Sequence, residues 1–105
     1  MYRFSMSEQM FIQGPVGQIE VFVDYPQGEV KGFAVICHPH PLQGGTPQHK
    51  VPTLLAQMLL EHGCIVYRPS FRGSGQSHGV HDEGYGETED TLQLIQYARI
   101  QHPTL

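Results

Sequence analysis

One stretch of eight residues limits the fold of this chain more than any other, because it contains two prolines and two glycines. Neither a helix nor a strand can run through residues 38–45, since proline has no N–H to donate and glycine favours loops. The stretch follows an apolar run, residues 32–37, that predicts a buried strand. Loops that leave such a strand and precede a helix carry the chemistry of open α/β sheets. The sequence therefore predicts an α/β fold with a functional loop at this point.

Backbone donors within this loop are limited to a few positions. Pro39 and Pro41 have no N–H, so among residues 39–42 only His40 and Leu42 can donate from the backbone. Such donors matter if the loop forms half of an oxyanion hole, which stabilises negative charge on an oxygen.

The N-terminal part of the chain predicts a β-hairpin. Residues 10–12 predict a short strand, and residues 14–17, which include two glycines and a proline, predict a turn. Ile19, Val21 and Val23 then alternate with Glu20, Phe22 and Asp24, which is the period of a strand. Residues 33–37 lack this alternation, so we expect a central strand covered on both faces.

A first helix is predicted after the proline-containing loop. Pro52 suits its first turn, and Gly63 suits the position just past its end. Apolar residues recur at helical spacing and are expected to form its inward stripe: Val51, Leu54, Leu55, Met58 and Leu59. Residues 64–67 then predict another short strand.

A second helix is predicted after a glycine-rich loop over residues 70–86. Its first turn carries negative charge, which the helix dipole favours, and Pro103 stops it. The acidic residues are Glu87, Glu89 and Asp90, and the expected inward face consists of Leu94, Ile95 and Ala98.

The order of elements predicts a single α/β domain, with an antiparallel hairpin first and then parallel strands flanked by helices. A helix that crosses a parallel sheet should lead to another strand, and residues 1–105 supply none. We therefore expect these residues to form the N-terminal part of a larger domain, with an unpaired sheet edge. A complete small three-layer domain is the alternative.

Composition excludes several classes of function. Six Lys and Arg residues against ten Asp and Glu give a net charge of −4 and no basic run, so nucleic-acid binding is not expected. No apolar run approaches the ~20 residues needed to cross a bilayer, and residues 1–5 do not resemble a secretory signal. We expect a cytoplasmic protein without a membrane contact.

The two cysteines are expected to be reduced and buried. Cys37 follows one predicted strand and Cys64 begins the next. If the strands run parallel, the two residues lie at opposite ends of the sheet, beyond the ~7 Å that a disulfide can span between Cα atoms.

Ser77 lies in a Gly-x-Ser-x-Gly pattern, residues 75–79, which is typical of a nucleophile elbow. The surrounding sequence argues against that function, because an elbow needs a strand just before the serine and a helix just after it. Asp90 and His102 complete a triad order on paper, but both are predicted at the last helix. A structural Ser77 and a nucleophilic Ser77 are both open, and the first is favoured.

Other motifs predict little chemistry. Residues 44–50 resemble a phosphate-binding loop but carry His49 and Val51 where that loop needs Gly and Ser or Thr. A metal site on His38 and His40 lacks any spacing signature, although His49, His78, His81 and Asp82 could contribute. Arg72 is expected to fix its own loop by bonding carbonyls or a carboxylate.

Taken together, these residues resemble the α/β-hydrolase superfamily, and specifically its small bacterial members with a His-Pro-His-Pro-Leu-x-Gly-Gly loop. The resemblance covers about residues 10–102 and rests on four pieces: residues 38–45, Lys50 with Val51, residues 68–77, and residues 84–87 with Asp90.

The resemblance implies serine-based hydrolysis of esters or amides without a cofactor or a metal. It implies that the backbone N–H of His40, or failing that of Leu42, is one oxyanion-hole donor. The active-site loops would include His38, Gly44, Gly45, Arg72, Gly73 and a structural Ser77. In that family the nucleophile, acid and base all come later than residue 105, so the chain by itself is expected to be inactive.

Two other functions are open. The scaffold could serve as a non-catalytic binding module, whose exposed sheet edge pairs with a partner or forms a homodimer. A metal-dependent enzyme that uses His38 and His40 is the third hypothesis.

Overall fold

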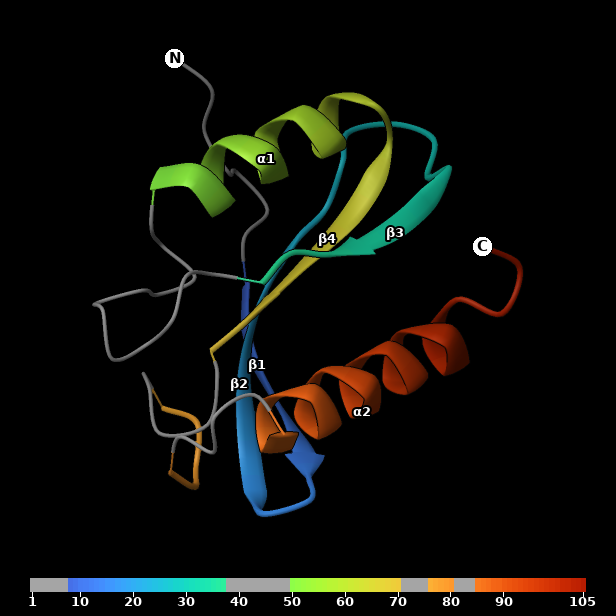
Figure 1. Cartoon of the computed structure of the whole chain (residues 1–105). Coiled ribbons are helices and arrows are strands. Elements are labelled where there is room, and N and C mark those ends of the chain that lie inside the picture. The colour runs from blue at the N-terminus through green and yellow to red at the C-terminus, as the bar shows by residue number, and fades with distance from the viewer. Residues whose placement is uncertain (1–7, 38–49, 71–75, 81–84) are drawn as a thin grey trace.

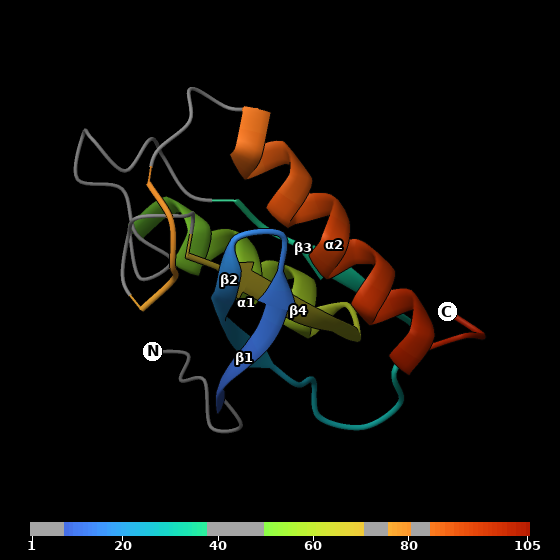
Figure 2. The same ribbon diagram turned by 90° about the horizontal axis from the view of Figure 1, so that it is seen from below.

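The computed structural model describes residues 8–37, 50–70, 76–80 and 85–105. These residues form a mixed sheet of four strands in the order β1-β2-β4-β3, with one helix on each side of it. Figure 1 shows α1 above the sheet and α2 below it, and Figure 2 shows the same arrangement from below. The elements are β1 (Glu8–Gly14), β2 (Gly17–Asp24), β3 (Gly32–Val35), α1 (Lys50–Glu61), β4 (Cys64–Pro69) and α2 (Tyr85–Gln101).

The N-terminal hairpin is confirmed. β1 and β2 pair antiparallel with Gly14 opposite Gly17, and Pro15 and Val16 form the turn between them. Gly17 has a φ of 129°, a backbone conformation that side chains disfavour. A Cβ at Gly17 would also lie 2.5 Å from Nδ1 of His78, so the hairpin needs glycine there.

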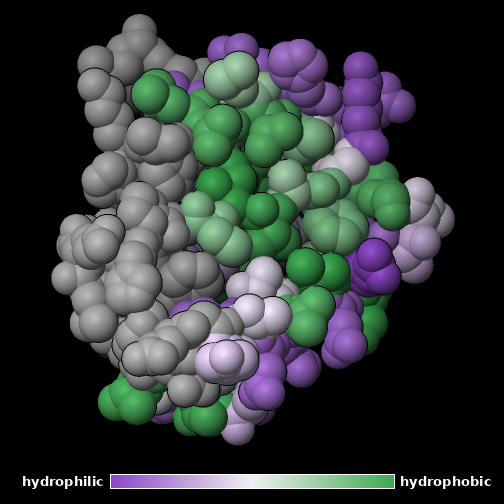
Figure 3. Space-filling model, in the orientation of Figure 1, coloured by the Kyte–Doolittle hydropathy of each residue, from purple (hydrophilic) through white to green (hydrophobic). Residues whose placement is uncertain are grey.

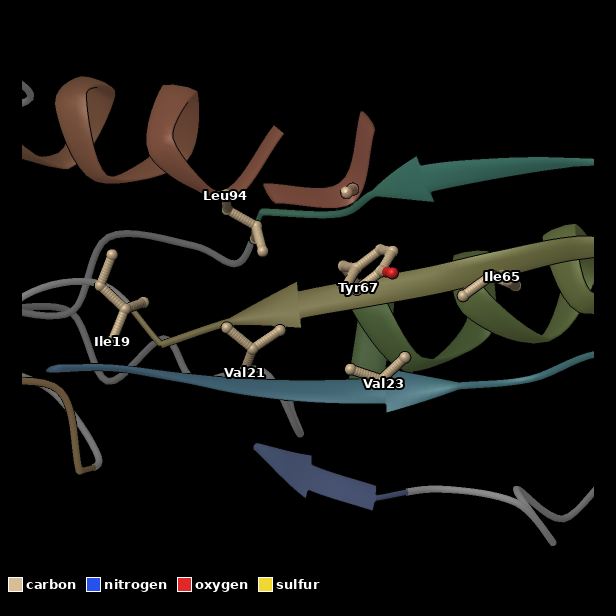
Figure 4. Packing of buried hydrophobic residues seen from close by; sticks show 7 residues of the cluster. Ile19, Val21, Val23, Ile65, Tyr67 and Leu94 are labelled. Carbon is tan, nitrogen blue, oxygen red and sulfur yellow. The ribbon is translucent and has the colours of Figure 1, made fainter. Parts of the chain in front are cut away.

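The strand that the alternation predicts is confirmed as β2, and its apolar side faces α2. Ile19, Val21 and Val23 pack against alternate residues of β4 and against α2, and Figure 4 shows these side chains between the sheet and the helix. The cluster consists of Ile19, Val21, Val23, Ile65, Tyr67, Leu94 and Ala98. Leu94 and Ala98 are thus inward as predicted, whereas Ile95 is only half-buried.

The predicted inward stripe of α1 is wrong in its phase. Ala56 and Leu60 are buried and pack with Ile36 and Val66, and Leu59 lies beside them. The exposed fractions of Leu54, Leu55 and Met58 are 49%, 46% and 59%. Helical spacing shows that residues share a face, but not which of two adjacent faces meets the sheet. Here the helix turns small Ala56 to the strands, so most of the larger apolar stripe stays in solvent; the side chain of Val51 lies outside the described ones.

The strand after residue 32 leaves an unpaired sheet edge among the described residues, as expected, and its predicted central position in a larger sheet stays a prediction. β3 pairs in parallel with β4 and forms an edge of the four-stranded sheet. An uninterrupted apolar run indicates that both faces of a strand are covered, and it carries no information about the two edges. Both faces do have apolar neighbours: Phe33 and Val35 pack toward the α2 side, and Ile36 packs on the α1 side.

The two cysteines are free, as expected. Cys64 pairs with Gly32 at the start of β3, while Cys37 follows the other end of that strand, so the parallel pairing separates them. The expectation that both are buried is wrong, because Cys37 is exposed and Cys64 is half-buried. The end of β3 at Val35 leaves Cys37 beyond the covered part of the sheet.

Candidate functional site

The predicted site is expected at the end of the sheet where β3 and β4 terminate, which is called the carboxyl edge below. β3 and β4 run parallel, so both end at this edge, and β2, which is antiparallel to β4, begins there. Carboxyl ends of parallel strands are where open α/β sheets bind their ligands. Of the sequence-predicted site residues, Ser77 is described; seven others lie outside the described residues and stay predictions: His38, His40, Leu42, Gly44, Gly45, Arg72 and Gly73.

Ser77 is buried at this edge, with 8% of its surface exposed. Its Oγ donates to the carbonyl of Ser70 at 2.7 Å and accepts from the N–H of Glu20 at 2.9 Å. Both partners are backbone groups, so among the described residues no side chain is placed to take its proton. The hydroxyl joins β2 to the end of β4.

Asp90 and His102, which could complete a triad with Ser77 by sequence order alone, lie far apart. Asp90 is buried in the first part of α2, and His102 follows the last turn of that helix. At 1.5 Å per residue the two are separated by about 18 Å along the helix. His102 Nε2 instead lies 2.7 Å from the hydroxyl of Tyr67, in an aromatic cluster with Phe33. These residues cannot act together on one serine.

Glu20 forms a buried carboxylate site beside Ser77 that sequence reasoning missed. Its side chain lies on the opposite face of β2 from the apolar cluster, and the residue is 4% exposed. Oε1 accepts from Ser70 Oγ at 2.7 Å and from the N–H of Gln76 at 3.1 Å, and Oε2 accepts from Gln9 Nε2. Strand alternation predicts that Glu20 and Asp24 share a face, but does not indicate that this face is buried.

A second set of contacts holds residues 76–78 along the start of β2. The N–H of His78 donates to the carbonyl of Gln18 at 2.9 Å, and the N–H of Gln18 donates to His78 Nδ1 at 3.2 Å. Gln18 Nε2 also donates to the carbonyl of Gln76 at 2.7 Å. Gln18 thus both donates hydrogen bonds to residues 76–78 and accepts one from them, so this short segment lies along β2 much as a neighbouring strand would.

A buried ion pair occupies the same face of the sheet further from the edge. Arg68 Nε donates to Asp24 Oδ2 at 2.8 Å, and their side chains are 5% and 1% exposed. The guanidinium carbon also lies 5.9 Å from the centre of the Phe22 ring. The pair joins β2 to β4 and is structural, because it is shut off from solvent.

Cys37 stands at the same edge but is poorly suited to act as a nucleophile. Although the residue as a whole is exposed, partial desolvation of its thiol raises the pKa, and a hydrogen bond with Thr91 of α2 only partly opposes this shift. The thiolate, which is the reactive form, is therefore disfavoured.

Metal binding finds no support in the described part of the chain. No group of three or more His, Cys, Asp or Glu side chains there could hold an ion. His38 and His40, on which the metal hypothesis rests, lie outside the described residues. In the same described ranges, neither helix has the length and apolar character needed to cross a bilayer.

Comparison with known proteins places the fold. No protein-family model matches the chain. An uncharacterized protein of Rickettsia prowazekii, RP471, is 33% identical over 95 residues, which are 90% of this chain and 40% of that protein. An α/β serine hydrolase homologue from Coxiella burnetii is 44% identical with a TM-score of 0.88, over 96% of this chain and 49% of that one. XC6422 from Xanthomonas campestris, an α/β serine hydrolase without a lid, is 36% identical with a TM-score of 0.88, over 99% and 49%.

These comparisons define the class of fold. The mixed four-stranded sheet with a helix on each side matches the N-terminal part of the α/β-hydrolase fold, as the sequence predicts. Both of these solved structures are described as an α/β serine hydrolase or a homologue of one. The chain spans about half the length of these structures, 49% in both cases.

Proposed function

We propose that the chain is part of a serine-type α/β hydrolase that cleaves carboxylic ester or amide bonds. The observation that carries this proposal is the 44% identity, at a TM-score of 0.88, to the Coxiella burnetii serine hydrolase homologue. The match covers 96% of the chain, so it is not confined to one element of the sheet. The fold alone would not carry a function, because α/β folds host many chemistries.

Within this function, residues 1–105 contribute half of an oxyanion hole. The backbone N–H of His40 is the donor we favour, and that of Leu42 is the second choice. One such donor contributes about 3–4 kcal/mol of transition-state stabilisation when a nucleophile is present. The other donor would follow the nucleophile on its elbow.

The catalytic triad, in this proposal, does not involve Ser77. Its hydroxyl is bonded to two backbone groups and is nearly shut off from solvent, which suits a structural link. The similar structures are about twice as long as this chain, so they have ample further sequence for a nucleophile, an acid and a base.

Labelling of the whole protein with a fluorophosphonate, which reacts with activated serines, tests the proposal. We expect one labelled serine other than Ser77, with equal labelling in Ser77→Ala once both samples are folded. Hydrolysis of p-nitrophenyl acetate should fall when the labelled serine is changed. Labelling of Ser77, or turnover by residues 1–105 that vanishes in Ser77→Ala, would overturn it.

An interaction module is the second candidate, and one observation favours it. Leu54, Leu55 and Met58 leave a large apolar surface on α1, and Figure 3 shows hydrophobic residues gathered over the face of the molecule that carries α1. In this alternative a second copy of the chain covers that surface, with the two β3 edges paired. Sedimentation should then show a dimer that Met58→Glu dissociates. A monomer at high concentration excludes this alternative.

A further inference from the structure

The position of Glu20 is unusual for a carboxylate. It lies on β2, which is paired on both sides, and its own carbonyl accepts the N–H of Ser70 at 2.9 Å. With 4% of the residue exposed, the carboxylate is largely removed from water, which is costly unless hydrogen bonds replace the lost solvent. Burial of the Glu20 carboxylate in the middle of the sheet therefore indicates that it serves a purpose.

The donors to this carboxylate identify that purpose. Ser70 and Gln76 both donate to the same oxygen, Oε1, at 2.7 and 3.1 Å. These residues stand immediately before and immediately after residues 71–75. One oxygen thus fixes the point where the chain leaves the sheet edge and the point where it returns.

The surrounding contacts make the same connection. Ser77 Oγ donates to the carbonyl of Ser70 at 2.7 Å, so the two ends of the segment are also joined directly. The N–H of Glu20 donates to Ser77 Oγ at 2.9 Å, which ties that link to β2. A carboxylate suits the centre of such a network, because it accepts several bonds and presents no donor of its own.

We propose that Glu20 is a positioning residue, whose carboxylate holds Ser70 and Gln76 together at the carboxyl edge of β3 and β4. It does not touch the substrate. It sets where the chain between those two residues departs from the sheet and where it rejoins it. The effect on catalysis rests on the proposed hydrolase function, whereas the effect on Ser70 and Gln76 does not.

Amide hydrogen exchange measures the positioning effect directly. In Glu20→Ala we expect the amides of Gln76 and His78 to exchange about tenfold faster or more, as for the loss of hydrogen bonds to a charged group. Amides of the β1–β2 hairpin should change less. Ser70→Ala removes one donor and leaves the carboxylate its bonds from Gln76 and Gln9, so it should have a smaller effect in the same direction and guards against a Glu20 variant that fails to fold.

Two further variants separate positioning from general stability. Glu20→Gln keeps one oxygen for Ser70 and Gln76, and the amide of Gln9 can turn to accept from the new NH2 group, so exchange should return close to the unchanged protein. Asp24→Asn is the matched control: the same face of β2, equally buried, but bonded to Arg68. It should leave exchange at Gln76 and His78 unchanged.

Activity of the whole protein toward p-nitrophenyl acetate completes the test. At equal folded fraction, Glu20→Ala should lower kcat about tenfold or more with little change in KM, and Glu20→Gln should restore most of it, as for a residue that positions others. Unchanged exchange at Gln76 and His78 in Glu20→Ala would overturn the proposal. Faster exchange with unchanged kcat would also overturn it, leaving a purely structural bond. If the unchanged protein hydrolyses no ester or amide, the hydrolase function fails, and exchange alone decides whether the carboxylate fixes Ser70 and Gln76.

Discussion

The two faces of the sheet are built from the same strands but held together by different forces. Toward α2, β2 and β4 present mainly apolar side chains, with Val21 and Val23 fully buried. On the opposite face the same two strands bury two carboxylates, a guanidinium and a hydroxyl: Glu20, Asp24, Arg68 and Ser70. Apolar contacts on the first face exclude water but have no preferred direction. Hydrogen bonds and the ion pair on the second face form only within a narrow range of distances and angles.

This difference separates stability from precision. Apolar packing tolerates small shifts, and its contribution grows with the area that is removed from water. Hydrogen bonds to buried charges add less net stability but penalise any arrangement that leaves a partner unmatched. The face that carries the polar contacts is also the one that fixes residues 76–78 at the candidate site.

The largest effect is expected from breaking the ion pair of the polar face. Asp24→Ala leaves the buried Arg68 without its carboxylate and should lower the free energy of unfolding by about 3–5 kcal/mol. Chemical denaturation measures this loss. The double variant Asp24→Ala with Arg68→Met should recover much of it, since neither member of the ion pair is then left buried without the other. If the double variant is no more stable than Asp24→Ala, pairing of these two charges does not determine the stability of the polar face.

A somewhat smaller effect is expected on the apolar face. Leu94 is fully buried against β2 and β4, so Leu94→Ala should cost about 2–4 kcal/mol through lost burial and the cavity that remains. Leu92, on the same helix but 55% exposed, supplies the control, and Leu92→Ala should change stability by less than about 1 kcal/mol. Equal losses in the two variants would contradict the assignment of the inward face of α2.

The smallest effect is expected at Tyr25, at the rim of the apolar face. Burial raises its pKa to about 12, and a hydrogen bond from its hydroxyl to Glu8 adds to the shift. Because the folded protein holds the phenol proton more tightly than the unfolded chain does, this stabilisation is complete below pH 10 and is lost between pH 10 and about 12. Tyr25→Phe should therefore flatten the loss of stability over that range, as followed by denaturation at several pH values. Glu8→Gln should lower the pKa only in part, since burial is the larger cause; a full return to 10 would reverse that order.

The sequence predicts the apolar face better than the polar one. Ile19, Val21 and Val23 identify their own face by alternation, and Leu94 and Ala98 identify the matching side of α2. The phase of α1 was not predictable, because burial of Ala56 depends on how closely the helix approaches β4 rather than on hydrophobicity. Burial of Glu20 was not predictable either, because its partners Ser70 and Gln76 are about 50 residues away in the chain. The catalytic contribution of His40 and Leu42 stays a prediction, as both lie outside the described residues.

The strict alternation of β2 also determines its pairing register. A slip of one residue against β1 or β4 would turn Glu20 and Asp24 toward α2, and Val21 and Val23 toward Arg68 and Ser70. Each misplaced group would be penalised twice, once for the site that it leaves and once for the site that it enters. A strand with one buried apolar face and one buried polar face thus excludes neighbouring registers strongly. An apolar strand of equal length excludes them less, because its side chains would fit either face after a shift.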